Sequence, residues 1–475
     1  MGHRRGEGRS RAALFPVMLD ELVSQDSLVR VVDAWVACLE LQVLGFGKAQ
    51  AQVMGAPPYD PADLLKLYIW GYLSAVRSSR ALERECRRNV ECMWLLGRLA
   101  PDHKTIAEFR RTNTPALVAA CAVFVQFARA QRLIAGNTVA IDGSKIRAVA
   151  SRKAVMDKQA LGEQARHNAQ QIEQYLQILD AQDRQDNSGE ARAQDVRRAL
   201  QRLQGQQAQV QENLQRLKQG RGQTAVRGEP QAQVMVQAGN RVPAYNLQTA
   251  VESQSHMIVA HEVSNDANDQ RQLQPMAQAA SSALGEPVIA VADAGYANGE
   301  QIARLGDEGI TTFVAVKRAV NNQAGGTLYE RSAFTYDAQS DSFACPADKT
   351  LQRKQLQSKD KMVIYAARPQ DCGACAHKLQ CTSAAQRFVS RHLYEGALQA
   401  NAHRMAERPE MMQLRKQTVE HPFADLKHLM LGNARLLMRG LAGARGELAI
   451  AVMAYNIKRA FNMKGAAWMR TALQG

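Results

Sequence analysis

The chain has 475 residues, with 60 lysines and arginines against 45 acidic residues, which gives a formal net charge of +15. This length exceeds one ordinary domain, so we expect two to four, and the positive excess favours a polyanionic partner. No run of about 18 apolar residues is present, which argues against a membrane span. The basic N-terminal segment is not followed by an apolar core, so we expect no signal peptide and a cytoplasmic protein.

Residues 12–134 are expected to be mostly helical, because apolar residues recur at helical spacing, most clearly from Pro61 to Leu73. A second helix is expected from Ser79 to about Leu96. Its apolar side would carry Leu82, Cys86 and Val90, and its opposite side Arg77, Arg80, Arg84, Arg87 and Arg88. An arginine-faced helix after a short break is typical of the reading element of a helix-turn-helix. An ordinary solvated helix face explains the same pattern equally well.

A third helix is expected to begin near Thr105. Thr105 and Glu108 have the spacing of a capping box, in which two side chains satisfy the first free amides of a helix. Asp102 is a rival N-cap for the same helix.

From residue 136 the pattern changes to short apolar runs typical of strands alternating with amphipathic stretches. We expect strands at 137–142, 245–251 and 257–263, a helix at 269–284, a strand at 287–292, a helix at 298–305 and a strand at 311–316. The second and third strands would form a hairpin. This order predicts a mixed α/β sheet.

Two segments interrupt that order, and the first is rich in glutamine, arginine and alanine. In residues 155–239, apolar residues lie at alternating three- and four-residue steps on both sides of a polar break at 186–189. They are Ile172, Leu176 and Leu179 before the break, and Val196, Leu200, Leu203, Val210, Leu214 and Leu217 after it. The pattern predicts an antiparallel helical hairpin with a coiled-coil-like seam; a disordered linker is the alternative.

The second interruption, residues 320–401, contains a cluster of cysteines. Cys372 and Cys375 have the spacing that lets two thiolates bind one tetrahedral ion, and Cys345 and Cys381 complete a set of four. We therefore expect a structural Zn²⁺ site, with His377 as a possible substitute ligand and four unligated thiols as the alternative. The other four cysteines, Cys38, Cys86, Cys92 and Cys121, are expected to be small buried side chains.

Three carboxylates stand at positions that suggest catalysis. Asp142 and Asp293 each end an apolar run that is expected to be a buried strand, and Glu420 lies in an amphipathic helical stretch. Burying an unpaired charge is costly, so these acids need a partner. Three converging carboxylates are an oxygen-rich cage for Mg²⁺ or Mn²⁺, and two such ions can support phosphodiester chemistry.

A set of short motifs is spread along the chain in the order Pro101–Arg110, Asp142–Lys145, Tyr245–Val251, Asp293–Tyr296, Val419–Phe423 and Tyr455–Arg459. Taken together and in this order, they resemble the bacterial insertion-sequence transposases of the DDE type. The resemblance implies an RNase H-like catalytic core in which Asp142, Asp293 and Glu420 are the metal-binding acids. Ala424 and Gln413 depart from the family, which commonly has a glycine and an aromatic residue there.

The resemblance also implies DNA contacts around the third acid. The family often has a cation four residues before the glutamate and a lysine seven after it, and Lys416 and Lys427 stand at these positions beside Arg415. Solvated helix charges are the alternative for each. We assign further DNA contacts to Lys145 in the first acidic motif and to Arg80, Arg84 and Arg87. Asp266 and Asp269 precede a helix, and we expect them to cap it; a catalytic role as rival carboxylates is the alternative.

The predicted organisation has four parts. An N-terminal helical DNA-binding domain spans 1–135; the RNase H-like core comprises 136–154, 240–319 and 402–465; the helical hairpin and the cysteine-rich module are insertions into that core. The hypothesis is a transposase that binds double-stranded element ends, cuts them and joins them to target DNA, as a homodimer or higher oligomer. A catalytically inactive DNA-binding protein of transposon origin and a structure-selective nuclease are the alternatives.

Overall fold

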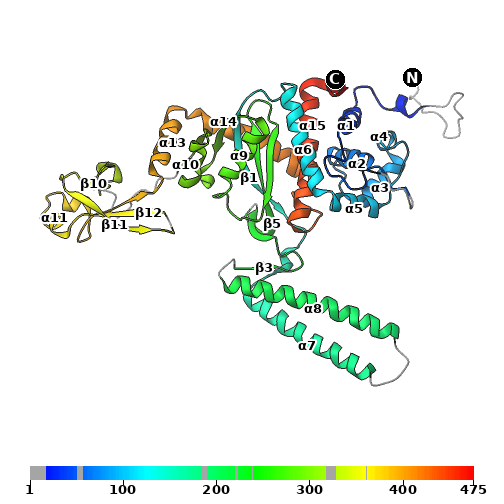
Figure 1. Cartoon of the computed structure of the whole chain (residues 1–475), viewed down its shortest axis with the longest axis horizontal. Helices are drawn as coiled ribbons and strands as arrows, with labels where there is room; N and C mark the ends of the chain where they lie inside the picture. The colour runs from blue at the N-terminus through cyan, green and yellow to red at the C-terminus, as the bar shows by residue number, and fades with distance from the viewer. Residues whose placement is uncertain are drawn as a thin grey trace, which may run out of the picture.

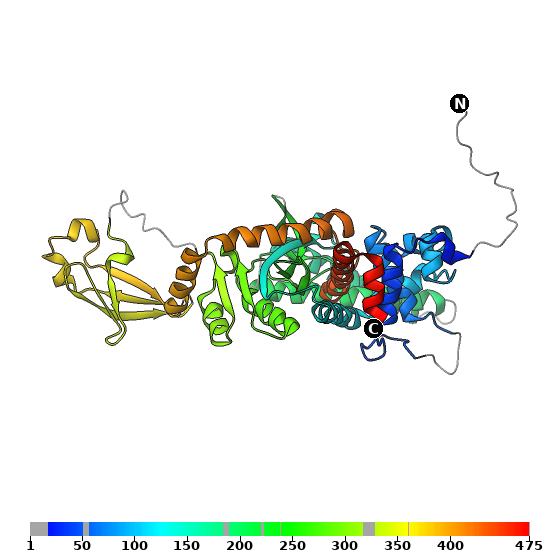
Figure 2. The ribbon, with the colours of Figure 1, turned by 90° about the horizontal axis from the view of Figure 1, so that it is seen from above.

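The computed structural model describes residues 18–50, 57–183, 190–219, 223–237, 239–316, 328–359 and 361–474. The molecule is elongated, with the N-terminal helices and the cysteine-rich module at opposite ends and the sheet between them (Figures 1 and 2). Residues 12–17 and 186–189, which entered the sequence predictions, lie outside the described ranges. Within the described ranges, no helix combines the length and apolarity needed to cross a membrane.

The N-terminal region is helical, as predicted. Its helices are α1 (Leu28–Ala37), α2 (Pro61–Leu73), α3 (Ser79–Arg88), α4 (Val90–Leu95), α5 (His103–Thr112) and α6 (Thr114–Ala130). The expected single helix from Ser79 to Leu96 is wrong, because it breaks at Asn89. The Asn89 side chain accepts hydrogen bonds from the amides of Glu91 and Cys92 and so starts α4. Val90 is consequently exposed, whereas Leu82 and Cys86 are buried as expected.

The start of α5 decides between the two predicted caps. Asp102 is the N-cap, and its carboxylate accepts from the amides of Lys104 and Thr105. Thr105 lies inside the helix and donates its hydroxyl to Asp102 over 2.7 Å, so the predicted capping box is wrong. The prediction of four buried isolated thiols is correct for Cys86, Cys92 and Cys121 and wrong for Cys38, which is exposed.

The central sheet has six strands. They are β1 (Thr138–Arg147), β4 (Gln233–Gln237), β5 (Asn240–Glu252), β6 (Ile258–Ser264), β7 (Ile289–Ala292) and β8 (Thr311–Val314). β1 pairs with β5 antiparallel and with β7 parallel, and β7 pairs with β8 parallel. β5 also pairs with β6 and, at its start, with β4. The predicted mixed sheet and hairpin are confirmed, and the strand order through the core is β6-β5-β1-β7-β8.

Helices cover both faces of this sheet. α14 (Glu410–Ala424) packs against β1 and β7, while α9 (Leu273–Leu284), α6 and α15 (Gly440–Gln474) pack against β6. α10 (Gly299–Asp307) and α13 (Glu395–Glu407) pack against β8. Figure 2 shows α14, in orange, running along one side of the sheet. One continuous apolar core joins the sheet, α15 and the N-terminal helices.

The first insertion is a helical hairpin made of α7 (Lys158–Asp183) and α8 (Glu190–Lys218), as predicted. It projects from the body (Figure 1), and a short ladder of β2 (Val155–Met156) with β3 (Ala225–Val226) closes its base. Leu200, Leu203 and Val210 are buried in the seam, but Leu176 is 44% exposed and lies outside it. At the one break in the apolar spacing, Gln207 donates its side-chain amide across the seam to the Ala165 carbonyl.

The second insertion is built on a five-stranded antiparallel sheet. Its strands are β9 (Thr335–Asp337), β10 (Ser342–Ala344), β11 (Thr350–Gln357), β12 (Met362–Ala366) and β13 (Phe388–His392), in the order β13-β12-β11-β10-β9. The short helices α11 (Pro369–Gly373) and α12 (Lys378–Cys381) lie between β12 and β13. Phe343, Leu351 and Tyr365 form a small core separate from that of the body.

A buried ion pair ties α15 to the N-terminal helices. Glu447 on α15 is fully buried, and its carboxylate lies 3.0 Å from the guanidinium of Arg77. The same carboxylate accepts from the amides of Leu437 and Met438. Arg77 was expected on the arginine face with Arg80 and its neighbours, but it is a structural residue that neutralises Glu447.

Replacing Arg77 should therefore unfold this helical unit more easily. In Arg77→Ala the buried Glu447 carboxylate loses its counter-ion, and we expect a loss of about 3 kcal/mol. All four tryptophans, Trp35, Trp70, Trp94 and Trp468, lie in the N-terminal helices or α15, so their fluorescence in urea follows this unit. Arg80→Ala, which removes an exposed arginine nearby, is the control. Equal urea midpoints for the two variants would contradict the assignment.

Candidate active site

Asp142 lies in the middle of β1. The strand was expected to end at this residue, but it continues to Arg147 because β5 pairs with it over residues 139–147. What ends near Asp142 is the parallel pairing of β1 with β7, whose last pair is Ile141 with Ala292. Asp142 therefore stands where the two parallel strands separate. Burial raises the pKa of its carboxyl, and the neighbouring Arg415 opposes that shift.

Asp293 follows directly after β7, as the sequence predicted. Its side chain accepts a 2.8 Å hydrogen bond from the Gly295 amide and caps the short helix η3 (Ala294–Tyr296). Since β1 and β7 are adjacent and parallel, this end of β7 lies beside Asp142. The sheet has thus brought together two aspartates that are far apart in the sequence.

A single guanidinium nitrogen joins the two aspartates. Arg415 Nη2, from α14, lies 2.9 Å from Asp142 Oδ1 and 3.2 Å from Asp293 Oδ2. The Arg415 side chain is 14% exposed, so the interaction is only partly screened by solvent. Arg415 was predicted to contact DNA; in this structure it neutralises the two carboxylates.

Glu420 is not part of this contact. It lies on α14 with an exposed side chain, and no ion pair or hydrogen bond of its carboxylate occurs in the described part of the chain. The acids that most affect the pKa of Asp142 are Asp293 and Asp269. The catalytic role of Glu420 stays a prediction.

The lysines around Glu420 do not lie on one uninterrupted α-helix, which the sequence prediction assumed. α14 is followed by a π-helical turn, η6 (Asp425–Met430), which shifts the register before Lys427. Lys416 is exposed, whereas Lys427 is half-buried, 5.3 Å from the ring of Phe423. Burial lowers the pKa of Lys427, and the charge of Asp142 acts in the opposite direction. Lys427 therefore lies within electrostatic range of Asp142.

Asp269 does not cap α9, contrary to expectation. α9 begins at Leu273 after Gln272, without a side-chain cap. The carboxylate of Asp269 instead accepts from Lys145 Nζ at 2.9 Å and from the side-chain amides of Asn246 and Gln248, both at 2.7 Å. Asp266 does not cap the helix either, because its carboxylate accepts from the Gln272 side chain.

The other predicted DNA contacts fall into two groups. Lys145 is 17% exposed and is paired with Asp269 beside the site. Arg80, Arg84 and Arg87 are exposed on α3, where Arg87 pairs loosely with Glu83. Exposure makes these three guanidinium groups available to a phosphate backbone, and their role stays a prediction.

The four clustered cysteines line one small pocket, of about 20 Å³, with Lys349 and Arg387. The amides of Lys349 and Arg387 donate to the sulfurs of Cys345 and Cys372, each over 3.4 Å. All four thiols are free. Within the described residues, however, no group of three or more histidines, cysteines or acids is arranged to hold a metal ion. The structure therefore does not contain the formed zinc centre that the spacing predicts.

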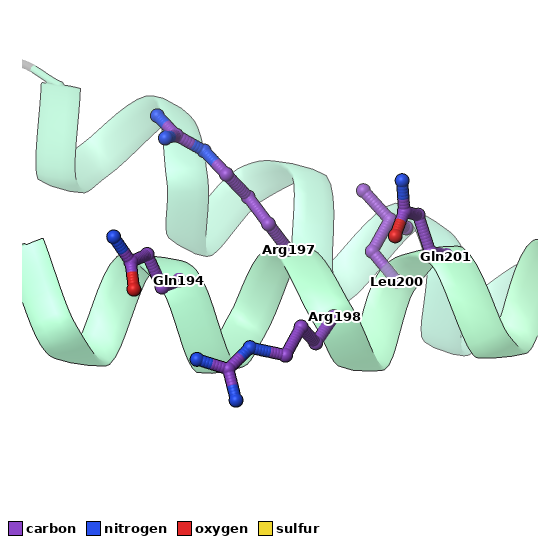
Figure 3. Close-up of a pocket in the computed structure, with 5 residues that line it drawn as sticks. All are labelled: Gln194, Arg197, Arg198, Leu200 and Gln201. Carbon is purple, nitrogen blue, oxygen red and sulfur yellow. The ribbon is translucent and has the colours of Figure 1, made fainter. Parts of the chain in front are cut away.

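A larger hollow, of about 400 Å³, lies on the distal hairpin, lined by Gln194, Arg197, Arg198, Leu200 and Gln201 of α8 (Figure 3). All five residues come from one helix, and Figure 3 shows Arg197 and Arg198 directed to different sides of it. No acid, cysteine or histidine lines this hollow, so it is not a candidate for the catalytic site.

Comparison with known families agrees with this geometry. Residues 139–457 match the family described as "Transposase DDE domain", and residues 17–112 match the family described as "Transposase domain (DUF772)". The first match covers more than half of the chain and includes all three predicted acids. The chain therefore belongs to the DDE transposases of insertion sequences and is an enzyme of that type. No curated protein and no solved structure matches it.

The donor set of the site fits the divalent metal that DDE transposases generally use. Two carboxylate oxygens face one cationic nitrogen at about the same distance, so the sheet already directs them toward one shared positive charge. Carboxylate oxygens are the ligands that Mg²⁺ and Mn²⁺ prefer. Asp142 and Asp293 would hold the ion in place of the Arg415 guanidinium.

Replacing Arg415 with glutamine should make the metal-free protein sensitive to alkaline pH. Loss of the guanidinium raises the folded-state pKa of Asp142 further above its unfolded value, because burial and the charge of Asp293 still raise it while only the weaker effect of the Gly143 amide hydrogen bond is left among the main causes that lower it. A raised carboxyl pKa gives a contribution to stability that is present at low pH and is lost as the pH rises through the folded pKa. The deficit in melting temperature relative to the native chain should grow from pH 4 to pH 8. Lys416→Gln, at the next position, is the control, and a pH-independent deficit would contradict the pairing.

Proposed function

We propose that this transposase binds the double-stranded ends of an insertion sequence, cleaves a strand at each end and joins the ends to target DNA, with Asp142, Asp293 and Glu420 as catalytic acids. The observation that carries the proposal is the meeting of Asp142 and Asp293 around one positive charge at the edge of the parallel strands. The family of the chain supports the same reaction.

The catalytic core is proposed to be RNase H-like. Three antiparallel strands, β6, β5 and β1, are followed across the sheet by the parallel strands β7 and β8, with helices on both faces. This arrangement supports the proposal and accounts for the position of the acids, because β1 and β7 are the central neighbours. The proposed core comprises residues 136–154, 240–319 and 402–465, with 155–239 and 320–401 as insertions.

The residues of the chain have distinct proposed roles. A bound Mg²⁺ or Mn²⁺ would polarise the phosphate and lower the pKa of an attacking water or hydroxyl. Asp142 and Asp293 hold that charge, and Glu420 completes the ligand set from α14. Lys427, half-buried near Asp142, stabilises negative charge on the phosphodiester. Arg415, Lys416 and Lys145 contact the flanking phosphates.

The overall reaction is a phosphoryl transfer in two steps. Water first hydrolyses a phosphodiester at the element end and frees a 3′ hydroxyl. That hydroxyl then attacks a phosphodiester of the target DNA, and a target 3′ oxygen leaves. Neither step needs an external energy source. The first is a hydrolysis by water, and the second breaks one phosphodiester for each one that it forms.

DNA binding is proposed to involve the N-terminal domain, residues 1–135, in a helix-turn-helix-like manner. α3 presents Arg80, Arg84 and Arg87 to solvent, and α4 follows after the break at Asn89. The net charge of +15 supports an extended phosphate contact. Because the proposed reaction acts on a pair of element ends, we propose a homodimer or larger assembly, acting on the bacterial nucleoid.

Two other functions remain as alternatives: a catalytically inactive DNA-binding protein of transposon origin and a structure-selective nuclease with the same core. The paired aspartates favour an enzyme over the first. A strand-transfer assay separates the second, because a nuclease releases ends without joining them to a target plasmid.

Asp142→Asn should abolish cleavage of a DNA fragment that carries the element end, in Mg²⁺, while a gel shift with the same fragment persists. The amide keeps the shape of the side chain but cannot hold a divalent ion as a carboxylate does. Glu420→Gln should have the same effect. The exposed Glu410 lies on the same helix, and Glu410→Gln is the control that should cleave normally. Normal cleavage by Asp142→Asn would refute the site, and normal cleavage by Glu420→Gln would remove only the third acid.

A structural Zn²⁺ in the cysteine-rich module is a second proposal, supported by the pocket that Cys345, Cys372, Cys375 and Cys381 share. Two backbone amides already donate to sulfurs there, as is favourable for thiolates. Binding an ion would require the sulfurs to move closer than they stand in this structure.

Zinc content of the purified chain tests this proposal. We expect about one Zn²⁺ per chain, since four thiolates saturate one tetrahedral ion, and we expect Cys375→Ser to lose it and to melt at a lower temperature. Cys38→Ser, which changes an exposed cysteine outside the module, should retain the metal. Native protein without zinc would overturn the proposal.

A further inference from the structure

A hydrogen-bond network links the segments that carry the two aspartates. It contains Asp269, Lys145, Asn246, Gln248 and Tyr296, none of which bonds to Asp142 or Asp293 through its side chain. We propose that Asp269 is a positioning residue of the catalytic site, which aligns β1 at Asp142 with the loop of Asp293. This inference rests on the proposed function of those two carboxylates.

Asp269 is the hub of the network. Its Oδ1 accepts from Lys145 Nζ at 2.9 Å, and from Asn246 Nδ2 and Gln248 Nε2 at 2.7 Å each. Asn246 and Gln248 are fully buried, so their amides have to be satisfied inside the protein. A carboxylate is a stronger acceptor than a neutral oxygen, and one carboxylate here orients three side chains from two strands.

One branch of the network reaches the loop of Asp293. Gln248 donates to Asp269 with Nε2 and accepts the Tyr296 hydroxyl with Oε1 at 2.5 Å. Tyr296 is fully buried, and its amide donates to the Asp293 carbonyl at 3.1 Å. The position of the η3 turn, which Asp293 caps, is thereby tied to β5.

The other branch reaches β1 beside Asp142. Lys145 belongs to the same strand as Asp142, three residues further on. Between them, Gly143 pairs with Gln248 across the strands, and a Cβ at Gly143 would lie only 2.7 Å from Asp269 Oδ1 and would also collide with the Gln248 amide. A glycine is therefore required for Asp269 and Gln248 to approach β1 this closely.

The two faces of β1 have different roles: one carries the proposed metal ligand Asp142, and the other contacts the Asp269 network. Successive side chains of a strand point to opposite faces, so Asp142 faces Arg415 while Gly143 and Lys145 face Asp269. A metal site tolerates errors of only about 0.5 Å in its ligands. The network on the Asp269 side holds both ligand-bearing segments against β5, which keeps the distance between Asp142 and Asp293 fixed when the cation between them changes.

Manganese binding to the full-length protein, without DNA, tests this role. Free Mn²⁺ is measured by electron paramagnetic resonance during titration, and the site is identified as the binding that Asp142→Asn removes. We expect Asp269→Asn, which keeps the shape but not the charge, to weaken this binding about tenfold, as is usual for residues that orient metal ligands. Asp266→Asn is the matched control, because Asp266 lies three residues away on the same loop and its carboxylate accepts from Gln272. The bond that its backbone carbonyl accepts from Asn246 does not depend on the side chain and is kept in this variant.

Tyr296→Phe provides the second variant, which breaks only the branch to Asp293. We expect it to weaken Mn²⁺ binding in the same direction but by less than Asp269→Asn. Tyr245→Phe is its control, since Tyr245 is a buried tyrosine of β5 whose hydroxyl bonds to Glu229, outside the network. If Asp269→Asn does not fold, the Mn²⁺ affinities of Tyr296→Phe and Tyr245→Phe decide whether the network positions the metal ligands.

The Mn²⁺ titrations test the catalytic site and the positioning role of Asp269 separately. If Asp142→Asn leaves all Mn²⁺ binding intact, the proposed catalytic site is wrong. If Asp142→Asn removes the binding but Asp269→Asn, or Tyr296→Phe in its place, binds as the native chain does, the positioning role is wrong. A lower melting temperature with unchanged Mn²⁺ affinity would make Asp269 a purely structural residue and would likewise overturn the inference.

Discussion

The arrangement of this molecule depends on one electrostatic constraint, which is that two aspartates held close together by adjacent parallel strands require a shared cation. Burial of Asp142 disfavours its charge, and the neighbouring Asp293 adds repulsion. The guanidinium of Arg415 satisfies both acids in this structure. Because Arg415 comes from α14, the same contact fixes that helix over the sheet, with the π-helical turn and Lys427 immediately after it.

The two insertions and the N-terminal helices surround the central sheet without interrupting the strands that carry the two aspartates. The hairpin of α7 and α8 and the cysteine-rich module project from the body in different directions (Figure 1). α15 runs between the sheet and the N-terminal helices, and the buried pair of Glu447 with Arg77 joins them. The proposed DNA-reading helix is therefore attached to the catalytic core through packed helices, and not through a flexible linker.

Local sequence patterns predicted much of the fold. The helix predicted at Pro61–Leu73 has the same bounds in the structure, and the predicted order of strands and helices from β5 to β8 is correct. The pattern failed where a distant partner decides the outcome. β1 continues past Asp142 because β5 covers it, although Gly-Ser-Lys has no strand pattern of its own. Asp269 has a capping residue's position in the sequence, yet three side chains from the sheet bind its carboxylate.

The geometry of α14 also constrains how a third acid can join the site. Arg415 and Glu420 are five positions apart, which is about 140° around a helix of 3.6 residues per turn. Both cannot face the two aspartates in one orientation of α14, and in this structure it is Arg415 that faces them. If Glu420 completes the ligand set, entry of a divalent ion and departure of the guanidinium must be accompanied by rotation or translation of the helix. The π-helical turn that follows α14 is a place where such a change can be absorbed, since its hydrogen-bond register already differs from that of the α-helix.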